Sequence, residues 1–134
     1  MNNSSTSAPA TSVLIVEDEE SILLSLEFLL GKEGYAVTTA RDGAAALRAL
    51  QTRSPDLVLL DVMLPLIDGF ELCRLIRENP ALRGTRIMLV TARGREAEIT
   101  RGMALGADAY LTKPFSTREL MEKVRALLGV LPPA

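Results

Sequence analysis

The stretch LVLLDVMLPLIDG, residues 57–69, decides the fold expected of this chain. Its first four residues are apolar, which is typical of a strand that a parallel sheet buries on both faces. The apolar run then stops at a carboxylate, Asp61. Ligands of open parallel sheets bind beyond the carboxyl ends of the strands, so this position indicates that the buried strand holds Asp61 rigidly at a functional site.

The rest of the chain alternates between strand and helix patterns. Besides 57–60, short apolar runs predict strands at 13–17 (VLIVE), 35–39 (YAVTT), 87–91 (IMLVT) and 109–112 (AYLT). Apolar residues at helical spacing lie between these runs, at 22–30, 43–51, 70–79, about 95–105 and after residue 116. This alternation favours an α/β fold with a five-stranded parallel sheet covered by helices on both faces.

Capping residues predict where the helices begin and end. Gly31 is expected at position C′ of the first helix, and Asp42 is expected to cap the start of the second. Ser116 and Glu119 have the spacing of a capping box at the start of the last helix. The ends predicted for the later helices are Pro80, Gly106 and Gly129 followed by two prolines.

The composition fits one globular domain with an aliphatic core. The chain has 134 residues, of which 48% are hydrophobic and only 4% aromatic, and a chain of this length buries about 68–70% of its unfolded surface. The net charge of −2 offers no general attraction for nucleic acid or an anionic membrane, so direct binding to either is not expected. No apolar run approaches the ~20 residues that span a bilayer.

The rare residue types exclude several chemistries. The absence of histidine excludes Ser-His-Asp and Cys-His catalysis and histidine metal ligands. The single cysteine, Cys73, excludes an internal disulfide and is expected to be a small core residue in a cytoplasmic protein. Residues 1–11 lack the features of a signal peptide and are expected to form a disordered polar tail. One domain is expected over 12–130, with 131–134 as a tail or the start of a linker.

Polar side chains follow the predicted strands at their carboxyl ends. They are Glu17 and Asp18 after the first strand, Asp61 after the third, Thr91 after the fourth and Lys113 after the fifth. These ends share one rim of a parallel sheet, which brings three acids, a hydroxyl and an amine together. Three carboxylates repel one another unless a cation lies between them, and Mg²⁺ suits such oxygen ligands. Asp61 can then attack a phosphoryl group, while Mg²⁺ and Lys113 neutralise the transferred oxygens.

The chain resembles the receiver domain of two-component response regulators. The resemblance runs from Ser12 to Leu128 and is carried by VLIVEDEE, LVLLDVMLPLIDGFELCRLIR, IMLVTAR and GADAYLTKPFSTREL, in this order and spacing. It implies a flavodoxin-like, doubly wound (βα)5 fold with strand order 2-1-3-4-5. It also implies a phosphoacceptor signalling switch that catalyses its own phosphorylation and dephosphorylation, in place of an enzyme that turns over a separate substrate.

The same resemblance implies a role for each matching residue. Asp61 would be the phosphoacceptor. Mg²⁺ would be bound directly by Asp18 and Asp61, by the backbone carbonyl of Met63, and through water by Glu17. Thr91 and Lys113 would contact the phosphoryl group. The switch would involve Thr91, Tyr110, whose ring changes rotamer, and Pro114, which would follow a cis peptide bond.

The implied partners are a sensor histidine kinase or phosphotransfer protein as phosphodonor, and a downstream protein or an effector domain. Phosphorylation would remodel the face made by the fourth helix, the fifth strand and the fifth helix. The chain departs from the family pattern at Leu66 and Ile67, where glycine and methionine are frequent, and at Ala109, where regulators with a winged-helix output usually carry a second acid. Met63 and Arg93 flank the site at positions where, as the resemblance implies, members of the family tune the phosphate lifetime.

Three other functions stay open as alternatives. A Mg²⁺-dependent phosphohydrolase with an aspartyl nucleophile typically needs a second acid two residues after the nucleophile, where this chain has Met63. A receiver-like domain that only binds partners would not need the reactive groups that are present here. A nucleotide-binding protein of similar fold would need a glycine-rich loop after the first strand, which the sequence lacks.

Overall fold

A parallel sheet of five strands forms the centre of the molecule. The structure is a computed structural model and describes residues 10–65, 67–92 and 94–129. The strands are β1 (Ser12–Val16), β2 (Ala36–Ala40), β3 (Leu57–Asp61), β4 (Arg86–Ala92) and β5 (Ala109–Lys113). They pair in the order β2-β1-β3-β4-β5, and every pair is parallel. The predicted fold class and strand order are therefore confirmed.

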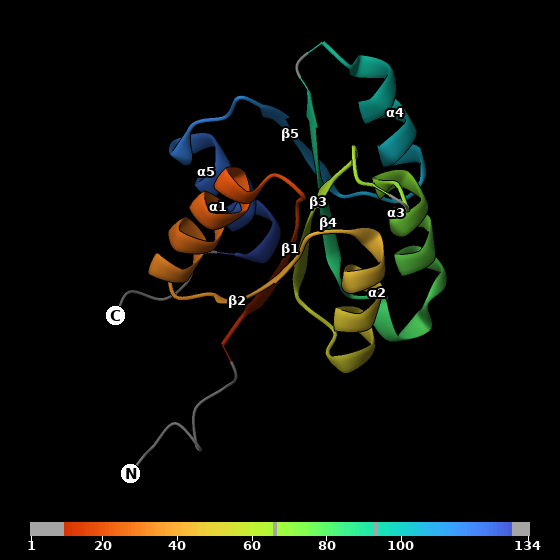
Figure 1. Cartoon of the computed structure of the whole chain (residues 1–134), viewed down its shortest axis with the longest axis horizontal. Coiled ribbons are helices and arrows are strands. Elements are labelled where there is room, and N and C mark those ends of the chain that lie inside the picture. Colours follow the sequence, from red (N-terminus) through yellow and green to blue (C-terminus); the bar gives the residue numbers. More distant parts are fainter. Residues whose placement is uncertain (1–9, 66, 93, 130–134) are drawn as a thin grey trace.

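Helices cover both faces of this sheet (Figure 1). They are α1 (Glu20–Lys32), α2 (Gly43–Thr52), α3 (Gly69–Glu78), α4 (Glu96–Ala104) and α5 (Thr117–Leu128), with a short 3-10 helix, η2 (Pro80–Leu82), after α3. In Figure 1, α1 and α5 lie on one side of the sheet, whereas α2, α3 and α4 lie on the other. The strand order reverses between β1 and β3, which is the position where open α/β sheets bind ligands.

The sheet has an aliphatic core on each face. Strand residues alternate between the two cores, so Leu57 and Leu59 pack with α1 and α5, whereas Val58 and Leu60 pack with α2 and α3. The α1 and α5 side also buries Leu23, Leu26, Leu30, Leu120, Met121 and Val124. Cys73 is fully buried in the other core, as predicted, and burial raises the pKa of its thiol. Central strands buried on both faces explain the continuous apolar runs in the sequence.

Most predicted helix boundaries are confirmed. The Asp42 carboxylate accepts a hydrogen bond from the Ala45 N–H at 2.8 Å and caps α2. Ser116 and Glu119 form the predicted capping box of α5, with both reciprocal hydrogen bonds present. Gly129 follows the last helical residue. These polar contacts satisfy backbone N–H groups that the first turn of a helix leaves without partners.

The predicted end of the first helix is wrong. Gly31 does not terminate α1, which continues to Lys32 and has Glu33 at its C-cap. The residue in the left-handed region is Gly34, with φ of 98°, and its N–H donates to the Gly31 carbonyl. A left-handed residue closes a helix most easily when it is glycine, so the second glycine of the pair provides the stop.

Several predictions concern residues outside the described ranges. They are the disordered tail over most of 1–11, the substitution at Leu66, the tuning role of Arg93 and the segment 131–134 with its prolines. Within the described ranges, no helix is both long and apolar enough to cross a membrane.

Candidate functional site

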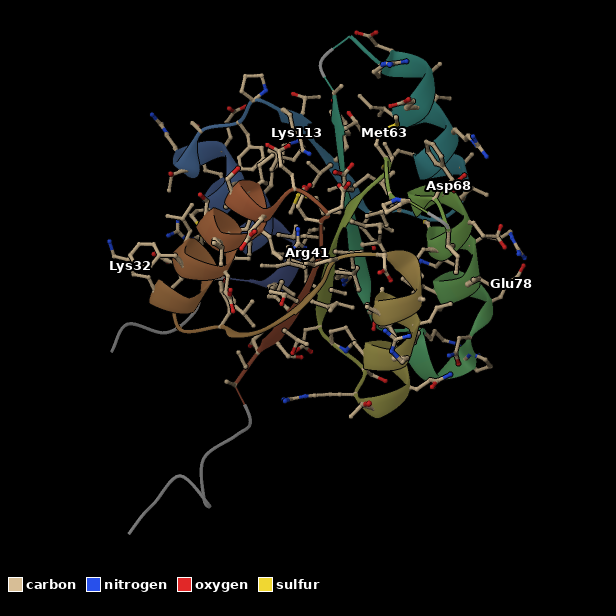
Figure 2. The ribbon with its side chains drawn as sticks, viewed as in Figure 1. Lys32, Arg41, Met63, Asp68, Glu78 and Lys113 are labelled. Carbon is tan, nitrogen blue, oxygen red and sulfur yellow. The ribbon has the colours of Figure 1, made fainter. Side chains whose placement is uncertain are left out.

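Asp61 ends β3 and lies at the carboxyl edge of the sheet. Its side chain is only 6% exposed, and both carboxylate oxygens have donors. The Lys113 Nζ donates to Oδ2 at 3.0 Å, and the backbone N–H of Met63 donates to Oδ1 at 2.9 Å. Figure 2 labels Met63 and Lys113 at the same end of the sheet. Two donors from different elements hold the carboxylate in one orientation.

Glu17 is the most deeply buried acid of the site. It follows β1, its side chain is 2% exposed, and its Oε2 accepts a hydrogen bond from the Glu19 N–H at 3.1 Å. Oε1 lies 3.1 Å from the Lys113 Nζ, which is an ion-pair distance, yet among the described residues it has no hydrogen bond of acceptable geometry. Burial, and next the charge of Asp61, raise the pKa of Glu17 to about 7. This is a buried carboxylate oxygen that lacks a complete set of partners.

Three carboxylates meet at this edge. Oxygens of Glu17, Asp18 and Asp61 all lie within 4.8 Å of one another. Asp18 is exposed, and its backbone carbonyl accepts a hydrogen bond from Arg41 Nη2 at 3.1 Å. A small divalent cation with oxygen ligands would fit three such acids, and it would bring positive charge to the incompletely partnered Glu17 oxygen. The donor set therefore fits Mg²⁺, and the structure brings together the acids that the sequence predicted.

Lys113 is the basic group of the site. It ends β5, and its Nζ lies between Asp61 Oδ2 and Glu17 Oε1, at 3.0 and 3.1 Å. Burial lowers the pKa of Lys113, but its hydrogen bond to Asp61 and the charges of Asp61 and Glu17 outweigh burial and keep the pKa above its ordinary value. Lys113 is therefore a permanent cation beside Asp61. The peptide bond between Lys113 and Pro114 is cis, as the sequence resemblance implied.

Thr91 lies on the neighbouring strand, β4. Its register partner on β5 is Thr112, and the next pair along is Ala92 with Lys113. The side chain is buried, and the hydroxyl donates to the Ala92 carbonyl at 3.3 Å. Thr91 thus lies at the same edge as Asp61, but its hydroxyl is engaged locally and makes no hydrogen bond to Asp61.

Tyr110 has an exposed ring on β5. The residue is 37% exposed, which makes its ring one of the few large apolar groups on the surface. The Lys123 Nζ, from α5, lies 4.3 Å from the ring centroid and also donates to the Tyr110 carbonyl. Sequence reasoning could not single out Lys123, because a lysine on a predicted helix is usually solvated.

The structure adds a contact at Met63, which the resemblance already placed at the site, and shows the role of Gly69, which sequence reasoning missed. The Met63 side chain is 63% exposed, and its backbone N–H, instead of its side chain, positions Asp61. Gly69 begins α3 directly against the end of β3, since a Cβ added there would lie 2.5 Å from the Asp61 carbonyl oxygen. Only a helix start without a side chain fits this close approach. A glycine before a helical pattern could have suggested it.

A groove adjoins Lys113 on the side of α1. It has a volume of about 570 Å³ and is bordered by α1 and by the segment that follows β5. The residues that line it are Ser21, Ile22, Ser25, Leu29, Lys113, Pro114, Phe115 and Thr117. The lining is largely apolar apart from Lys113 and the hydroxyls, so the acids and the groove form separate parts of one edge of the molecule.

Comparisons with known proteins agree with this fold. The family model of the response regulator receiver domain matches residues 13–125. The phosphate regulon transcriptional regulatory protein PhoB of Rhizobium meliloti is 48% identical over 116 residues, 87% of this chain and 51% of that protein. The alkaline phosphatase synthesis transcriptional regulatory protein PhoP of Bacillus subtilis is 46% identical over 116 residues, 87% of this chain and 48% of that protein.

Solved structures show the same likeness. Chemotaxis protein CheY4 of Vibrio cholerae superposes with a TM-score of 0.83 at 32% identity, covering 92% of this chain and all of that chain. A doubly wound five-stranded sheet with an acid cluster and a lysine at its carboxyl edge defines the class of receiver-type α/β domains. This chain belongs to the family of response regulator receiver domains. It spans about half the length of the curated relatives PhoB and PhoP.

Proposed function

We propose that Asp61 accepts a phosphoryl group from a phosphohistidine of a sensor histidine kinase or phosphotransfer protein, in a Mg²⁺-dependent reaction. The observation that carries the proposal is the position of the Asp61 carboxylate. It lies within 4.8 Å of two further acids and 3.0 Å from the Lys113 ammonium. A carboxylate fixed between a cation site and a lysine is arranged to attack phosphorus while its surroundings neutralise the transferred oxygens.

The transfer exchanges one bond to phosphorus for another. An Asp61 carboxylate oxygen forms a bond to phosphorus as the phosphorus–nitrogen bond of the donor histidine breaks, and the imidazole nitrogen keeps the electron pair. The 134 residues contain no histidine, so the donor histidine lies outside this sequence. The Lys113 ammonium, now paired with Asp61 Oδ2, then pairs with the new phosphoryl oxygens.

The metal-binding residues in this proposal are Asp18, Asp61, Glu17 and the backbone carbonyl of Met63. When bound, Mg²⁺ would supply positive charge to the phosphoryl oxygens and act as a template for the reactants. The support comes from the three carboxylates within 4.8 Å and from the incompletely partnered Glu17 oxygen. Met63 adjoins them, since its N–H already contacts Asp61.

The signal would pass from the phosphoryl group to Thr91 and Tyr110. In the structure the Thr91 hydroxyl donates to the Ala92 carbonyl, and the Tyr110 ring is partly exposed. A phosphoryl group on Asp61 would offer Thr91 a charged acceptor in place of that carbonyl, drawing the end of β4 inward. Tyr110 would follow into the space vacated, which remodels the face made by α4, β5 and α5 for a partner. Pro114 would fix the turn that carries Lys113.

The domain would cover 12–130 and work in the cytoplasm. Its relatives PhoB and PhoP are about twice as long as the segment matched here and are called transcriptional regulatory proteins. CheY4, in contrast, is matched over its entire solved chain. The output would therefore be either an effector domain in a longer protein or a separate downstream protein, and the receiver domain itself would not bind nucleic acid.

Acetyl phosphate tests the proposal directly. With Mg²⁺ and this small phosphodonor, the intact mass of the protein should rise by one phosphoryl group, whereas Asp61→Asn should gain none. An acidic residue away from the site, Glu122 on the exposed face of α5, gives the matched control Glu122→Gln, which should be phosphorylated normally. No gain of mass in the unmodified protein would reject the proposal. Turnover of a chromogenic phosphate ester that depends on Asp61 would favour the phosphohydrolase alternative.

A further inference from the structure

We infer that Lys123 is a positioning residue that holds the Tyr110 ring outward and so opposes the phosphorylated state. The inference rests on the proposed function, in which the Tyr110 ring moves inward. It starts from two contacts made by one ammonium group. The Lys123 Nζ lies 4.3 Å from the centroid of the Tyr110 ring and donates a hydrogen bond to the Tyr110 backbone carbonyl.

The backbone contact anchors Lys123 whichever way the ring points. β5 is the last strand of the sheet and, within residues 10–65, 67–92 and 94–129, pairs only with β4, so one side of its backbone has no neighbouring strand there. Edge strands leave N–H and C=O groups that need other partners. The Lys123 ammonium provides one for the Tyr110 carbonyl. On the Tyr110 side this bond involves the backbone carbonyl and not the ring, so it survives a change of ring rotamer.

The ring contact depends on the rotamer. A cation above an aromatic face is attracted by the ring, and this attraction ends when the ring turns away from it. With Nζ held at the backbone carbonyl, the ammonium favours the outward ring selectively. Lys123 therefore interacts more favourably with the outward ring than with the inward ring. Such a difference in interaction free energy between two conformations shifts the equilibrium toward the favoured one.

No carboxylate competes for Lys123 within the described part of the chain. None lies within 4.0 Å of its ammonium, whereas Arg118 and Arg125 on the same helix both have acidic partners. Glu119, one turn before Lys123, has its carboxylate engaged in the capping box. The residue before Tyr110 is Ala109, which has no charge to offer. The ammonium is therefore directed to Tyr110.

Tyrosine fluorescence can follow this ring by itself. The chain has no tryptophan and two tyrosines, of which Tyr35 is 5% exposed in the core. In a Tyr35→Phe background, all tyrosine emission comes from Tyr110, and quenching by acrylamide reports its exposure. Removing Lys123 without any movement of the ring would uncover the ring and increase quenching. Removing a restraint on an inward movement would decrease it.

The experiment compares Lys123→Met with Lys123→Arg and Arg118→Met in that background. Lys123→Met should decrease quenching and, with Mg²⁺ and beryllofluoride as the phosphoryl mimic, bind the mimic about two- to fivefold more tightly, as expected for losing a surface cation–π contact. Lys123→Arg keeps a cation above the ring and should behave as the unmodified protein. Arg118→Met removes the same charge from an exposed position of α5 and should change neither value.

Unchanged or increased quenching in Lys123→Met overturns the inference. So does an equal gain of affinity in Arg118→Met, since the effect would then be one of net charge. If Lys123 had a purely structural role, Lys123→Met would bind beryllofluoride more weakly than the unmodified protein and could not bind it more tightly. If the unmodified protein and every variant fail to bind beryllofluoride, the proposed function is contradicted, and the quenching comparison still decides the Lys123 contact.

Discussion

At the scale of single residues, the site depends on the balance between three acids and one lysine. Lys113 is shared between Asp61 and Glu17, and Glu17 is the acid that this sharing leaves least satisfied. The sequence predicted that these groups would meet, because each follows a strand of one parallel sheet. It could not predict the sharing, which depends on side-chain rotamers and on distances of about 3 Å that no strand pattern encodes.

The raised pKa of Glu17 predicts a pH-dependent stability without metal. The pKa is 4.5 in an unfolded chain and about 7 in the folded protein, so between these values the folded state binds more protons and unfolding becomes easier as the pH rises. Since a tenfold change in proton affinity corresponds to about 1.4 kcal/mol, the loss can reach about 3 kcal/mol between pH 4.5 and pH 7.5.

Urea unfolding in the presence of a chelator measures this loss. Glu17→Gln cannot ionise and should lose less stability over the same range, while Glu96→Gln, at an exposed position of α4, should follow the unmodified protein. If the unmodified protein and Glu17→Gln lost the same free energy of unfolding over this pH range, the loss could not be assigned to ionisation of Glu17.

At the scale of elements, two glycines show how differently the same residue can function. Gly31 lies inside α1, and a Cβ added there would meet no atom of the described residues within 4 Å. At Gly69 the added Cβ would lie 2.5 Å from the Asp61 carbonyl oxygen and 2.6 Å from the Val62 Cα. Sequence reasoning assigned the end of α1 to Gly31, whereas Gly34 makes the turn. Both glycines can close a helix, and the sequence pattern does not show which of them does so. Sequence reasoning missed Gly69 because close approach is a property of packing.

The two positions predict opposite effects of alanine. Gly31→Ala should raise the free energy of unfolding by about 0.5–1 kcal/mol, because alanine loses less backbone entropy in a helix. Gly69→Ala should lower it by about 1–3 kcal/mol, because backbone atoms at the end of β3 must move. Urea denaturation of both variants checks the stability, and the extent of acetyl phosphate labelling checks whether Gly69→Ala also displaces Asp61. Equal effects at the two positions would refute this account of α3.

At the scale of the whole molecule, the acids predict that Mg²⁺ stabilises the fold. A ligand that binds only the folded state adds about 1.4 kcal/mol when its free concentration is tenfold above the dissociation constant. Thermal unfolding should therefore shift upward with Mg²⁺ in the unmodified protein. The shift should shrink in Asp18→Asn, whose carboxylate belongs to the cluster, and persist in Glu122→Gln. A response that any salt reproduces at equal ionic strength would argue against a specific site.

The fold itself was predictable to a greater extent than the site. Alternating apolar runs are sufficient to predict a doubly wound sheet, because strands buried on both faces cannot be polar. The strand order came only from the family resemblance, since periodicity does not reveal which strands are neighbours. Strand ends differed by about one residue from the predictions. β4, for example, extends over Arg86–Ala92 because β3 and β5 pair with it on both sides.

The central place of β1 has a consequence for how the chain is made. β1 pairs with both β2 and β3, so three adjacent strands are complete once Asp61 has left the ribosome. Lys113 emerges more than fifty residues later, on the last strand to join. Until then the nascent chain holds Glu17 and Asp61 without their ammonium counterpart. A growing polypeptide would thus keep its most acidic corner hydrated, and that corner would close only after β5 has been synthesised.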